Sequence, residues 1–463
     1  MKCLTISDND HILIIGAGIL GTTLAYAISS LCNTKITILE QEEKPGLHTS
    51  SRNTGKVHAP FIYNPEKKKV WAKAAAYGYD FLKDYCRSNG LAFIEDGVVE
   101  VAADPKSEKT LHQYFEWGIK NGLNESEITI LSKREVSTIE PHVRCQAAVF
   151  CKKDASVNYG QITQTMGNQI PIKNKRARII TFSKVVDIRI EPSKQSIKVE
   201  YFDSLEKTKR EIDCSFLINA AGSNSINILN KLRIEHPYQD LLFRGEYWIA
   251  PSRYNDLTRH SIYSVPQFQQ FPFLDPHWII RVSGTREVGP NACPVLSPYG
   301  YNNFTNAKEF LPKIYGLISK KNHGINRTLF RKELLDLVTK EALSSISKRY
   351  MINRVKKFLP SIDPKEFRTR GTAGIRSVLI DKDGSFVSNP VFILRDNILH
   401  ILNYNSPGAT GAIPISYAII FKLLSEGILK CSQETITAQK VAPFDVNLVN
   451  VCKEELDIDI AWQ

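Results

Sequence analysis

Residues 11–21 of the chain read HILIIGAGILG, and this stretch decides the fold class. The apolar, β-branched run of residues 11–15 predicts a buried parallel strand. A glycine pattern follows, and residues 22–31 (TTLAYAISSL) then predict a helix. In such a strand–turn–helix unit the three glycines permit a tight turn, close approach of a phosphate, and close packing of helix on strand. The sequence therefore predicts a dinucleotide site, with backbone contacts from Gly16, Gly18, Ile19, Leu20 and Gly21.

A second predicted strand, residues 35–39 (KITIL), ends directly before an acidic residue. This residue, Glu40, comes nineteen positions after Gly21 and is followed by Gln41. An acid at about this spacing accepts hydrogen bonds from the ribose hydroxyls of a bound dinucleotide. We therefore expect both residues at the adenosine end of the cofactor.

The length and composition of the chain limit the class of protein to which it can belong. The chain has 463 residues, of which 43% are hydrophobic and 23% charged, and this predicts two or three globular units rather than a disordered, collagenous or coiled-coil protein. Nine scattered cysteines without a CxxC pair favour free thiols in a reducing cytosol, with neither a disulfide framework nor a metal site. The first residues lack a secretory signal, and the apolar stretch 409–424 is too short to span a bilayer. We expect a cytoplasmic protein.

The positive charge is concentrated in one region. The chain carries a net charge of +12, and residues 308–357 alone hold thirteen Lys or Arg against four acids. The region predicts two or three amphipathic helices, with an apolar face supplied by Leu334, Leu335, Leu337 and Val338. A solvated face, peripheral contact with an anionic membrane, and nucleic-acid binding all remain open, although no nucleic-acid motif accompanies the charge. We expect no nucleic acid.

Three further segments suit a flavin dinucleotide. Small and hydroxylated residues at 48–60 (HTSSRNTGKVHAP) predict a helix start whose amides face a second phosphate. The strand predicted at 216–219 ends on small residues, which let the chain pass close to the cofactor. Residues 406–411 (SPGATG) open a long predicted helix, whose N-terminus would stabilise the negative charge of a reduced flavin.

The order of these pieces resembles the FAD-dependent oxidoreductases of the D-amino-acid oxidase superfamily. Within it the closest resemblance is to the L-2-hydroxyglutarate dehydrogenase/oxidase family, over roughly residues 10–428. The segments that carry it are SSRNTGKVHA at 50–59, FRGEYW at 243–248, IYSVPQFQQFPFLDPHW at 262–278, VGPNACPVLSPYGY at 288–301, KFLPSI at 357–362, GIRSVLIDKDG at 374–384 and ILHILNYNSPGAT at 398–410.

The resemblance implies FAD as the cofactor and a set of residues that hold it. Besides the glycine turn, Glu40 and Gln41, these are Ser50, Ser51, Arg52, Asn53, Thr54, Val185, Gly222, Gly408, Ala409 and Thr410. It also implies an active-site histidine at His58, which a hydride transfer needs as the base for the substrate hydroxyl. Arg376 and then Arg244 are the expected carboxylate anchors, because guanidinium binds carboxylate in a bidentate manner. Lys56 is a further cation, and Tyr63 and Tyr263 are candidate hydroxyl donors.

The expected fold is α/β, mixed with α+β: a Rossmann-like FAD-binding domain with an inserted antiparallel-sheet substrate domain. Residues 1–85, 150–235 and 360–430 are expected to form the first domain, residues 86–150 and 236–358 the second, and residues 431–463 a C-terminal tail. The expected activity is oxidation of a small 2-hydroxy acid, L-2-hydroxyglutarate, to its 2-oxo acid, with electrons passed to an unidentified acceptor other than NAD. The alternatives are oxidation of an amino acid, an N-methyl amine or glycerol 3-phosphate, and a flavoprotein that acts on nucleic acid.

Overall fold

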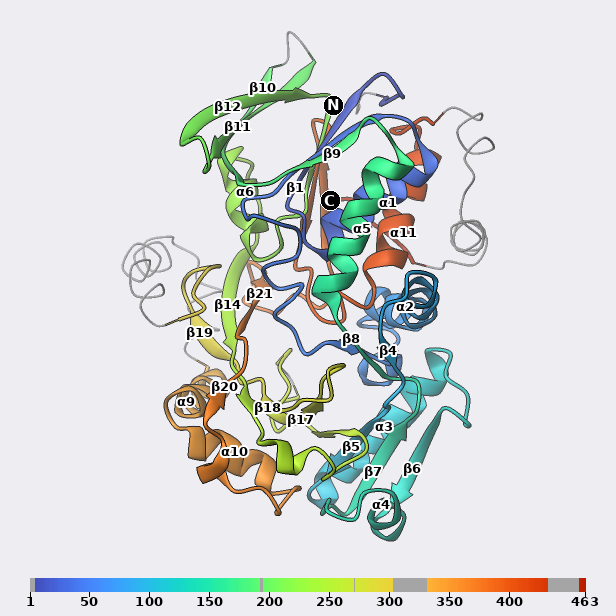
Figure 1. Ribbon diagram of the computed structural model, residues 1–463, viewed down its shortest axis with the longest axis vertical. Helices are drawn as coiled ribbons and strands as arrows, with labels where there is room; N and C mark the ends of the chain where they lie inside the picture. Colours follow the sequence, from blue (N-terminus) through green and yellow to red (C-terminus); the bar gives the residue numbers. More distant parts are fainter. Residues whose placement is uncertain (1–4, 192–194, 270, 303–330, 432–457) are drawn as a thin grey trace.

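The computed structural model describes residues 5–191, 195–269, 271–302, 331–431 and 458–463 (Figure 1). Its central element is β1 (His11–Ile15), which lies inside a six-stranded sheet and leads through the glycine turn into α1 (Ile19–Leu31). The sheet order is β22 (Val391–Arg395), β23 (Ile398–Leu402), β13 (Phe216–Asn219), β1, β2 (Lys35–Leu39) and β9 (Ala177–Ile180). Only β22 runs antiparallel to its neighbour. The predicted parallel strands and the first helix are confirmed.

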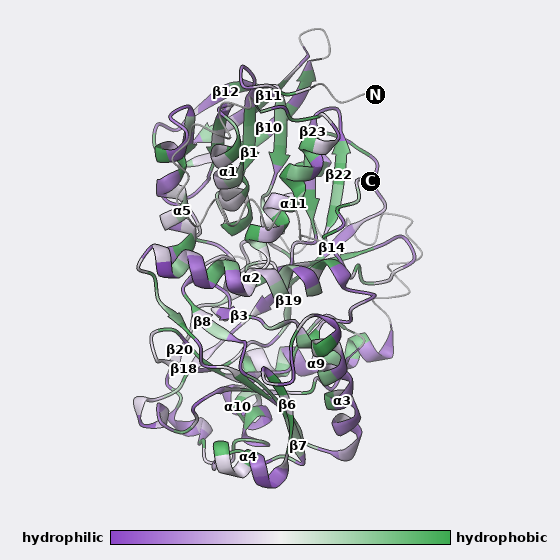
Figure 2. Ribbon diagram, turned by 90° about the vertical axis from the view of Figure 1, so that its right-hand side faces the viewer, coloured by the Kyte–Doolittle hydropathy of each residue, from purple (hydrophilic) through white to green (hydrophobic). Residues whose placement is uncertain are grey.

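The two faces of this sheet are covered by different layers, because alternate side chains of β1 point to opposite sides. Ile12 and Ile14 pack with the helices α1, α2 (Lys69–Ser88), α5 (Tyr159–Lys173) and α11 (Ala412–Ser425). Leu13 and Ile15 instead pack against a three-stranded antiparallel sheet of β10 (Ser183–Glu191), β11 (Ser196–Asp203) and β12 (Thr208–Cys214). Figure 2 shows β1, β22 and β23 as mainly hydrophobic strands, as expected for a sheet buried on both faces.

A second, eight-stranded sheet fills the other half of the molecule (Figure 1, lower half). Its order is β20 (Thr369–Arg370), β15 (Trp248–Ile249), β18 (Arg286–Gly289), β17 (His277–Ile280), β16 (Ser261–Ser264), β5 (Val98–Ala102), β7 (Ala147–Cys151) and β6 (Ile128–Ser132). All pairings are antiparallel except that of β16 with β5. The expected mixed α/β fold with an antiparallel second sheet is confirmed. The helices α3 (Pro105–Lys120), α4 (Lys133–Ile139), α9 (Lys332–Ile346) and α10 (Lys348–Lys356) belong to this half.

Two small sheets join the halves. One contains β3 (Lys56–Val57), β8 (Ala155–Val157) and β4 (Phe93–Ile94), and the other contains β19 (Cys293–Val295), β14 (Gln239–Gly245) and β21 (Gly374–Ile380). The remaining elements are α6 (Ser225–Lys231) and the short 3₁₀ helices Pro60–Ile62, Gly222–Asn224, Ser252–Tyr254 and Pro364–Glu366. Because β20 pairs with β15, the start of segment 360–430 lies with the second sheet. The division into domains stays a prediction.

The basic region is described only in part, since residues 308–330 lie outside the described residues. The rest forms α9 and α10, as predicted. Leu334 and Leu337 are buried and Val338 packs beside them, but Leu335 is 47% exposed. Of the four residues predicted to supply the apolar face, Leu335 therefore does not pack with the others.

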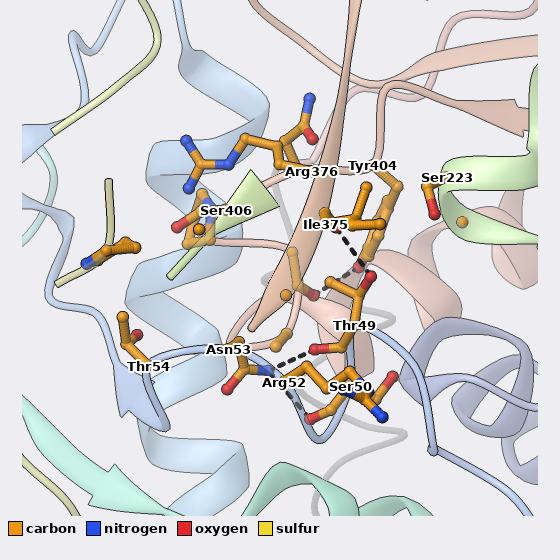
Figure 3. Close-up of a pocket in the computed structure, with 18 of the residues that line it drawn as sticks. Thr49, Ser50, Arg52, Asn53, Thr54, Ser223, Ile375, Arg376, Tyr404 and Ser406 are labelled. Carbon is orange, nitrogen blue, oxygen red and sulfur yellow. Dashed lines mark hydrogen bonds between the residues drawn. The ribbon is translucent and has the colours of Figure 1, made fainter. Parts of the chain in front are cut away.

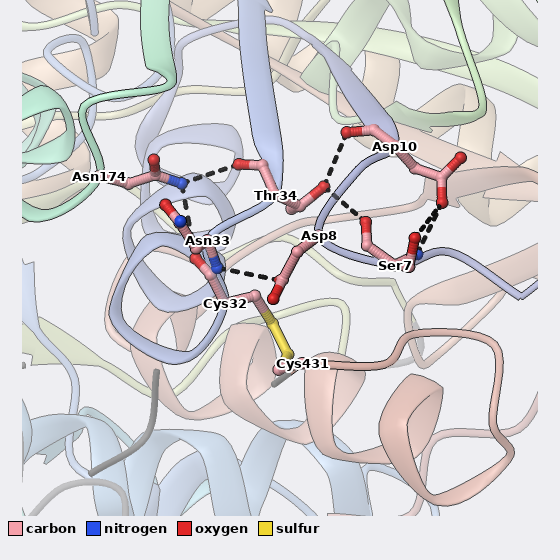
Figure 4. The surroundings of a disulfide bond; sticks show 8 residues. All are labelled: Ser7, Asp8, Asp10, Cys32, Asn33, Thr34, Asn174 and Cys431. Atoms are coloured by element: carbon pink, nitrogen blue, oxygen red, sulfur yellow. Dashed lines mark hydrogen bonds between the residues drawn. A yellow bond between two sulfur atoms is a disulfide. The ribbon is translucent and has the colours of Figure 1, made fainter. Parts of the chain in front are cut away.

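The cysteines differ from the expectation of free thiols. Cys32, at the end of α1, forms a disulfide with Cys431, which follows α11 (Figure 4). The physical reason is that α1 and α11 pack side by side, so the two cysteines that follow them meet with Cα atoms 4.8 Å apart although 399 positions separate them in sequence.

At the other end of the predicted tail, Ile458 and Ile460 are buried against the helix-covered face of the first sheet. No helix among the described residues is long and apolar enough to cross a membrane.

Candidate active site

The glycine turn after β1 brings the backbone of α1 close to its neighbours. Gly16 has a φ of 96°, and a Cβ atom there would lie 2.9 Å from the carbonyl oxygen of Ala220. A Cβ atom on Gly21 would lie 2.0 Å from the oxygen of Gly16, so only glycine permits this packing. No acidic residue occupies the first turn of α1. The helix N-terminus therefore presents an uncompensated partial positive charge, which suits a phosphate.

Glu40 lies at the end of β2, where two backbone amides hold its carboxylate. Oε2 accepts a hydrogen bond from the amide of Ala17 at 2.8 Å, and Oε1 accepts one from Glu42 at 3.0 Å. Burial raises the pKa of Glu40, and the two hydrogen bonds oppose that shift. The next residue, Gln41, accepts a hydrogen bond from the hydroxyl of Tyr299 at 2.9 Å. Neither Glu40 nor Gln41 is among the described residues that line the cavity, so their contact with a cofactor stays a prediction.

A cavity extends from the start of α1 into the gap between the two halves (Figure 3). Segments far apart in the sequence form its walls. They are residues 18–20, 49–58, 220–223, 243–247, 273–277, 290–292, 374–377 and 401–410, together with Tyr159. The predicted cofactor segments are thus brought together around one cavity, with Gly18, Ile19, Leu20, Ser50, Arg52, Asn53, Thr54, Gly222, Gly408, Ala409 and Thr410 in its lining.

The loop before β3 forms one wall, but it does not start a helix. Residues 45–51 form successive turns, and the side-chain Nδ2 of Asn53 donates hydrogen bonds to the carbonyl oxygens of Thr49 and Ser50 at 3.2 and 3.0 Å (Figure 3). These side-chain bonds take the place of helical ones. Ser50 Oγ in turn accepts a hydrogen bond from the amide of Ile19 at 2.8 Å, which ties the loop to α1. The helix predicted here is therefore wrong, although the loop does line the cavity.

The loop before α11 forms the opposite wall. A Cβ atom on Gly408 would lie 2.5 Å from the oxygen of Asn405, so the tight turn requires glycine. Thr410 Oγ1 accepts a hydrogen bond from the amide of His58 at 3.1 Å and lies 3.0 Å from the hydroxyl of Tyr159. The start of α11 is thereby fixed to the predicted catalytic histidine, 352 positions away in sequence.

His58 follows β3 and lines the cavity. Its Nδ1 atom lies 4.0 Å from Oδ2 of Asp154. Burial, together with the charges of Lys56, His277 and Arg376, lowers the pKa of His58 to about 3. The imidazole is therefore neutral at physiological pH and can accept a proton, as a general base must.

Lys56 does not act as the free cation that the sequence suggested. Its Nζ atom lies 2.8 Å from both carboxylate oxygens of Asp96, 3.2 Å from Oδ1 of Asp154 and 3.1 Å from Oγ of Ser156. The ammonium group is thus already paired inside the protein. Lys56 lines the cavity, but its charge is matched by these carboxylates, and a role in binding a substrate carboxylate stays a prediction.

Arg376, on β21, is one of the cations that line the cavity (Figure 3). Its Nη1 atom donates a hydrogen bond to the carbonyl oxygen of Pro272 at 2.7 Å. Among the residues that the structure describes, no carboxylate pairs with it. Burial lowers the pKa of Arg376, and nearby Tyr247 and Tyr63 oppose that shift. A guanidinium held in this setting is suited to an anionic ligand.

Several other predicted residues lie outside the described lining of the cavity. Arg244 is buried and paired with Oε1 of Glu246 at 3.1 Å, and its role as a second anchor stays a prediction. Tyr63 is buried behind the wall, where burial raises the pKa of its hydroxyl. Val185 packs in the core between the first sheet and β10–β12, and its place beside the adenine stays a prediction. Ser51 is exposed and Tyr263 is buried.

Sequence reasoning missed two polar residues at the site. His277 lines the cavity, its Nδ1 lies 2.9 Å from the carbonyl oxygen of Asp275, and its ring centroid lies 4.0 Å from that of Tyr263. It stands in the quoted segment at 262–278, before an apolar strand, and nothing local marked it. Asp154 lies between β7 and β8, directly before the strand that pairs with β3, and only this long-range pairing brings it within 4.0 Å of His58.

The residues present fit FAD. The start of α1 without an acidic residue in its first turn, the close packing that the glycines permit, and the continuous cavity between the two loops match what a dinucleotide with a second ring system needs. The turn at residues 16–21 and the loop at 50–54 would hold the phosphates. Gly408, Ala409 and Thr410 would lie beside the flavin.

Comparisons with known proteins agree with this assignment. The family model "FAD dependent oxidoreductase" matches residues 11–420. The mitochondrial L-2-hydroxyglutarate dehydrogenase of Bos taurus is 27% identical over 88% of this chain and 86% of its own length. The L-2-hydroxyglutarate dehydrogenase of Salmonella houtenae is 28% identical over 89% of this chain and 92% of its own length.

Solved structures show the same fold at low identity. The L-alpha-glycerophosphate oxidase from Mycoplasma pneumoniae, solved with FAD bound, has a TM-score of 0.66 and 19% identity, with 93% of this chain and 95% of that chain covered. The glycine oxidase from Geobacillus kaustophilus has a TM-score of 0.64 and 12% identity, with 94% and 98% covered. Because the family model matches most of the chain, the protein belongs to the FAD-dependent oxidoreductases and uses FAD as its cofactor.

Proposed function

We propose that the protein oxidises L-2-hydroxyglutarate to 2-oxoglutarate. The observation that carries this proposal is Arg376, a cation in the cavity wall without a carboxylate partner among the described residues. A 2-hydroxy acid brings the missing carboxylate, and the planar guanidinium can bind it in a bidentate manner. The two relatives named L-2-hydroxyglutarate dehydrogenase, aligned over most of their length, support this substrate over an amine or a glycerol phosphate.

His58 is the proposed base for the substrate hydroxyl. It lines the same cavity as Arg376, and its neutral ring can take the hydroxyl proton when the carbinol carbon gives up its hydride. Bound FAD supplies the two-electron acceptor for that hydride. A carboxylate on Arg376 would also cancel part of the positive charge that lowers the pKa of His58, so substrate binding strengthens the base.

The experiment is anaerobic bleaching of the oxidised flavin by a panel of substrates at equal concentration. The panel holds L- and D-2-hydroxyglutarate, L-lactate, L-glutamate, sarcosine and glycerol 3-phosphate. We expect L-2-hydroxyglutarate to bleach the flavin fastest. Faster bleaching by an amino acid, the amine or the phosphate would assign the protein to another activity of the same family.

For the partner of the basic helices, we propose weak peripheral contact with an anionic membrane. Leu335, Leu343 and Ile346 on α9 are 47, 43 and 83% exposed, and Lys332, Lys348 and Arg349 lie near them in sequence. Apolar side chains next to cations are typical of a surface that binds anionic lipid. We expect the protein to sediment with vesicles that contain anionic lipid at low salt and to dissociate as salt is added. Equal sedimentation with neutral vesicles would contradict this proposal.

A further inference from the structure

The strand pairing beside the cavity brings three charged groups and one histidine together. β8 pairs with β3 such that Lys56 lies opposite Ser156 and Val57 opposite Ala155. The same antiparallel register places His58 opposite Asp154, one position further on. On its other edge β8 pairs with β4, with Ile94 opposite Ser156. Asp154 directly precedes β8, and its carbonyl oxygen accepts a hydrogen bond from the amide of Gly97 at 3.0 Å, so the backbone holds it between the proposed base and the residue after Asp96.

This cluster contains one carboxylate more than it contains cations. Lys56 is the one ammonium group, and it contacts Asp96 at 2.8 Å through both oxygens but Asp154 at 3.2 Å through only one. The side chain of Asp154 is 2% exposed, so water does not offset its charge. Its Oδ2 atom accepts a hydrogen bond from the amide of Ala59 at 3.4 Å and lies 4.0 Å from Nδ1 of His58. The unbalanced negative charge of the cluster thus lies on the side of His58.

We propose that Asp154 is the positioning residue of His58: it orients the ring and stabilises the imidazolium that forms when His58 takes the substrate proton. This inference rests on the proposed function. In the step, the hydroxyl O–H bond of the substrate breaks, its electron pair stays on oxygen, and an N–H bond forms at Nε2 of His58. Nδ1 keeps its hydrogen toward Asp154, which itself takes up no proton. The Lys56–Asp96 pair holds Asp154 in place.

A pH effect follows from the charges around Asp154. Burial raises the pKa of Asp154 to about 6, the ammonium of Lys56 lowers it, and the like charge of Asp96 raises it. The other titratable groups that face it are His58, the hydroxyls of Tyr63, Tyr79, Tyr159 and Tyr263, and the thiol of Cys151. Below about pH 6 Asp154 is protonated, so the rate of proton abstraction should fall as the pH falls through this value.

The test measures the rate of flavin reduction in a stopped-flow instrument from pH 5 to 8 for wild type, Asp154→Asn and Asp96→Asn holoenzymes. Asp154→Asn keeps the shape but removes the charge, and we expect reduction about 10²-fold slower, without the fall in rate near pH 6. Asp96→Asn keeps Asp154 and removes its like-charged neighbour, so the fall in rate should move to lower pH. Binding of 2-oxoglutarate to the oxidised holoenzymes, measured by calorimetry, should change less than threefold in Asp154→Asn.

For variants that keep their flavin, two outcomes would overturn the inference. One is an Asp154→Asn variant with the rate and pH profile of the wild type. The other is a variant in which 2-oxoglutarate binding weakens as much as the rate falls, since that indicates a merely structural role. If L-2-hydroxyglutarate does not bleach the wild-type flavin, the proposed substrate fails, and the same comparison with the panel member that does bleach it decides the role of Asp154. If both variants lose their flavin, the residues serve the cofactor site, and the inference is likewise rejected.

Discussion

At the scale of single residues, His58 and Arg376 line one cavity but carry out different tasks. We expect His58→Ala to slow flavin reduction by L-2-hydroxyglutarate by about 10²–10⁴-fold, the usual contribution of a positioned base. Arg376→Lys keeps the charge but loses the planar fork, so it should mainly raise the substrate concentration that gives half-maximal reduction. Stopped-flow reduction with both holoenzymes separates the two effects. A wild-type rate for His58→Ala would show that another group takes the proton.

Glu100 gives a residue-level prediction on stability. It is 1% exposed in β5, and neither carboxylate oxygen has a hydrogen-bond partner among the described residues. Burial raises the pKa of Glu100 to about 8, and Asp275 adds to the shift. The folded protein therefore keeps this proton up to about pH 8, whereas the unfolded chain releases it near about pH 4.3. The contribution of Glu100 to stability is greatest below the lower value and is lost as the pH rises through the window between them.

Glu100→Gln, which stays neutral at every pH, should therefore gain in melting temperature relative to wild type as the pH rises from 5 to 8. Calorimetric scans of both proteins across this range measure the difference. Glu116→Gln, at an exposed position of α3, is the matched control and should show no such trend. A difference between Glu100→Gln and wild type that stays constant with pH would contradict the prediction.

Some single residues could be placed from the sequence, whereas the ion pairs of others could not. His58 and Arg376 could be placed at the cavity because they stand within motifs of neighbouring residues. The pairing of Lys56 could not be predicted, because its partners Asp96 and Asp154 lie beside other strands and only the paired β3, β8 and β4 bring them together. The same limit applies to Arg244, whose charge is matched by Glu246.

At the scale of elements, the glycine turn makes a prediction about cofactor binding. A Cβ atom on Gly18 would lie 3.3 Å from Oγ of Ser50, so one methyl group requires only a small shift of that side chain. We expect Gly18→Ala to weaken FAD binding and Gly18→Val to abolish it, because the branched side chain fills the space that the pyrophosphate needs. The flavin content of the purified variants measures this, with circular dichroism as the control for folding. A folded Gly18→Val variant with full flavin content would refute the role of the turn.

Elements with a strong local sequence pattern could be predicted. Segments in which side-chain hydrogen bonds compete with backbone ones could not. β1, α1 and β2 follow from hydrophobic periodicity and glycine spacing. The loop at residues 45–53 was predicted to begin a helix, but Asn53 bonds the carbonyl oxygens that a helix would use, and Gly55, with a φ of 72°, turns the chain into β3. Asparagine and glycine of this kind compete with helix formation in ways that composition alone does not show.

At the scale of the whole molecule, the two-sheet architecture could be predicted, but the contacts between distant segments could not. β14 and β21 lie in segments that were assigned to different domains, yet they pair over seven residue pairs. The disulfide between Cys32 and Cys431 likewise joins positions whose proximity depends on how α1 packs on α11. Such contacts depend on the complete fold, and no local sequence pattern predicts them.

This disulfide supports the last prediction. It lies at the end of α1, a helix of 13 residues that begins at the cavity, so roughly 20 Å separates it from the cofactor site. Cys431→Ser should therefore keep its FAD and its rate of flavin reduction. It should nevertheless melt about 5 °C below the oxidised wild type, because the link no longer restricts the unfolded chain. Reductant should lower the melting temperature of the wild type to that of the variant, whereas Cys293→Ser, which removes a free thiol, should respond to reductant as wild type does. A non-reduced peptide map of the wild type without a Cys32–Cys431 cross-link would contradict the prediction.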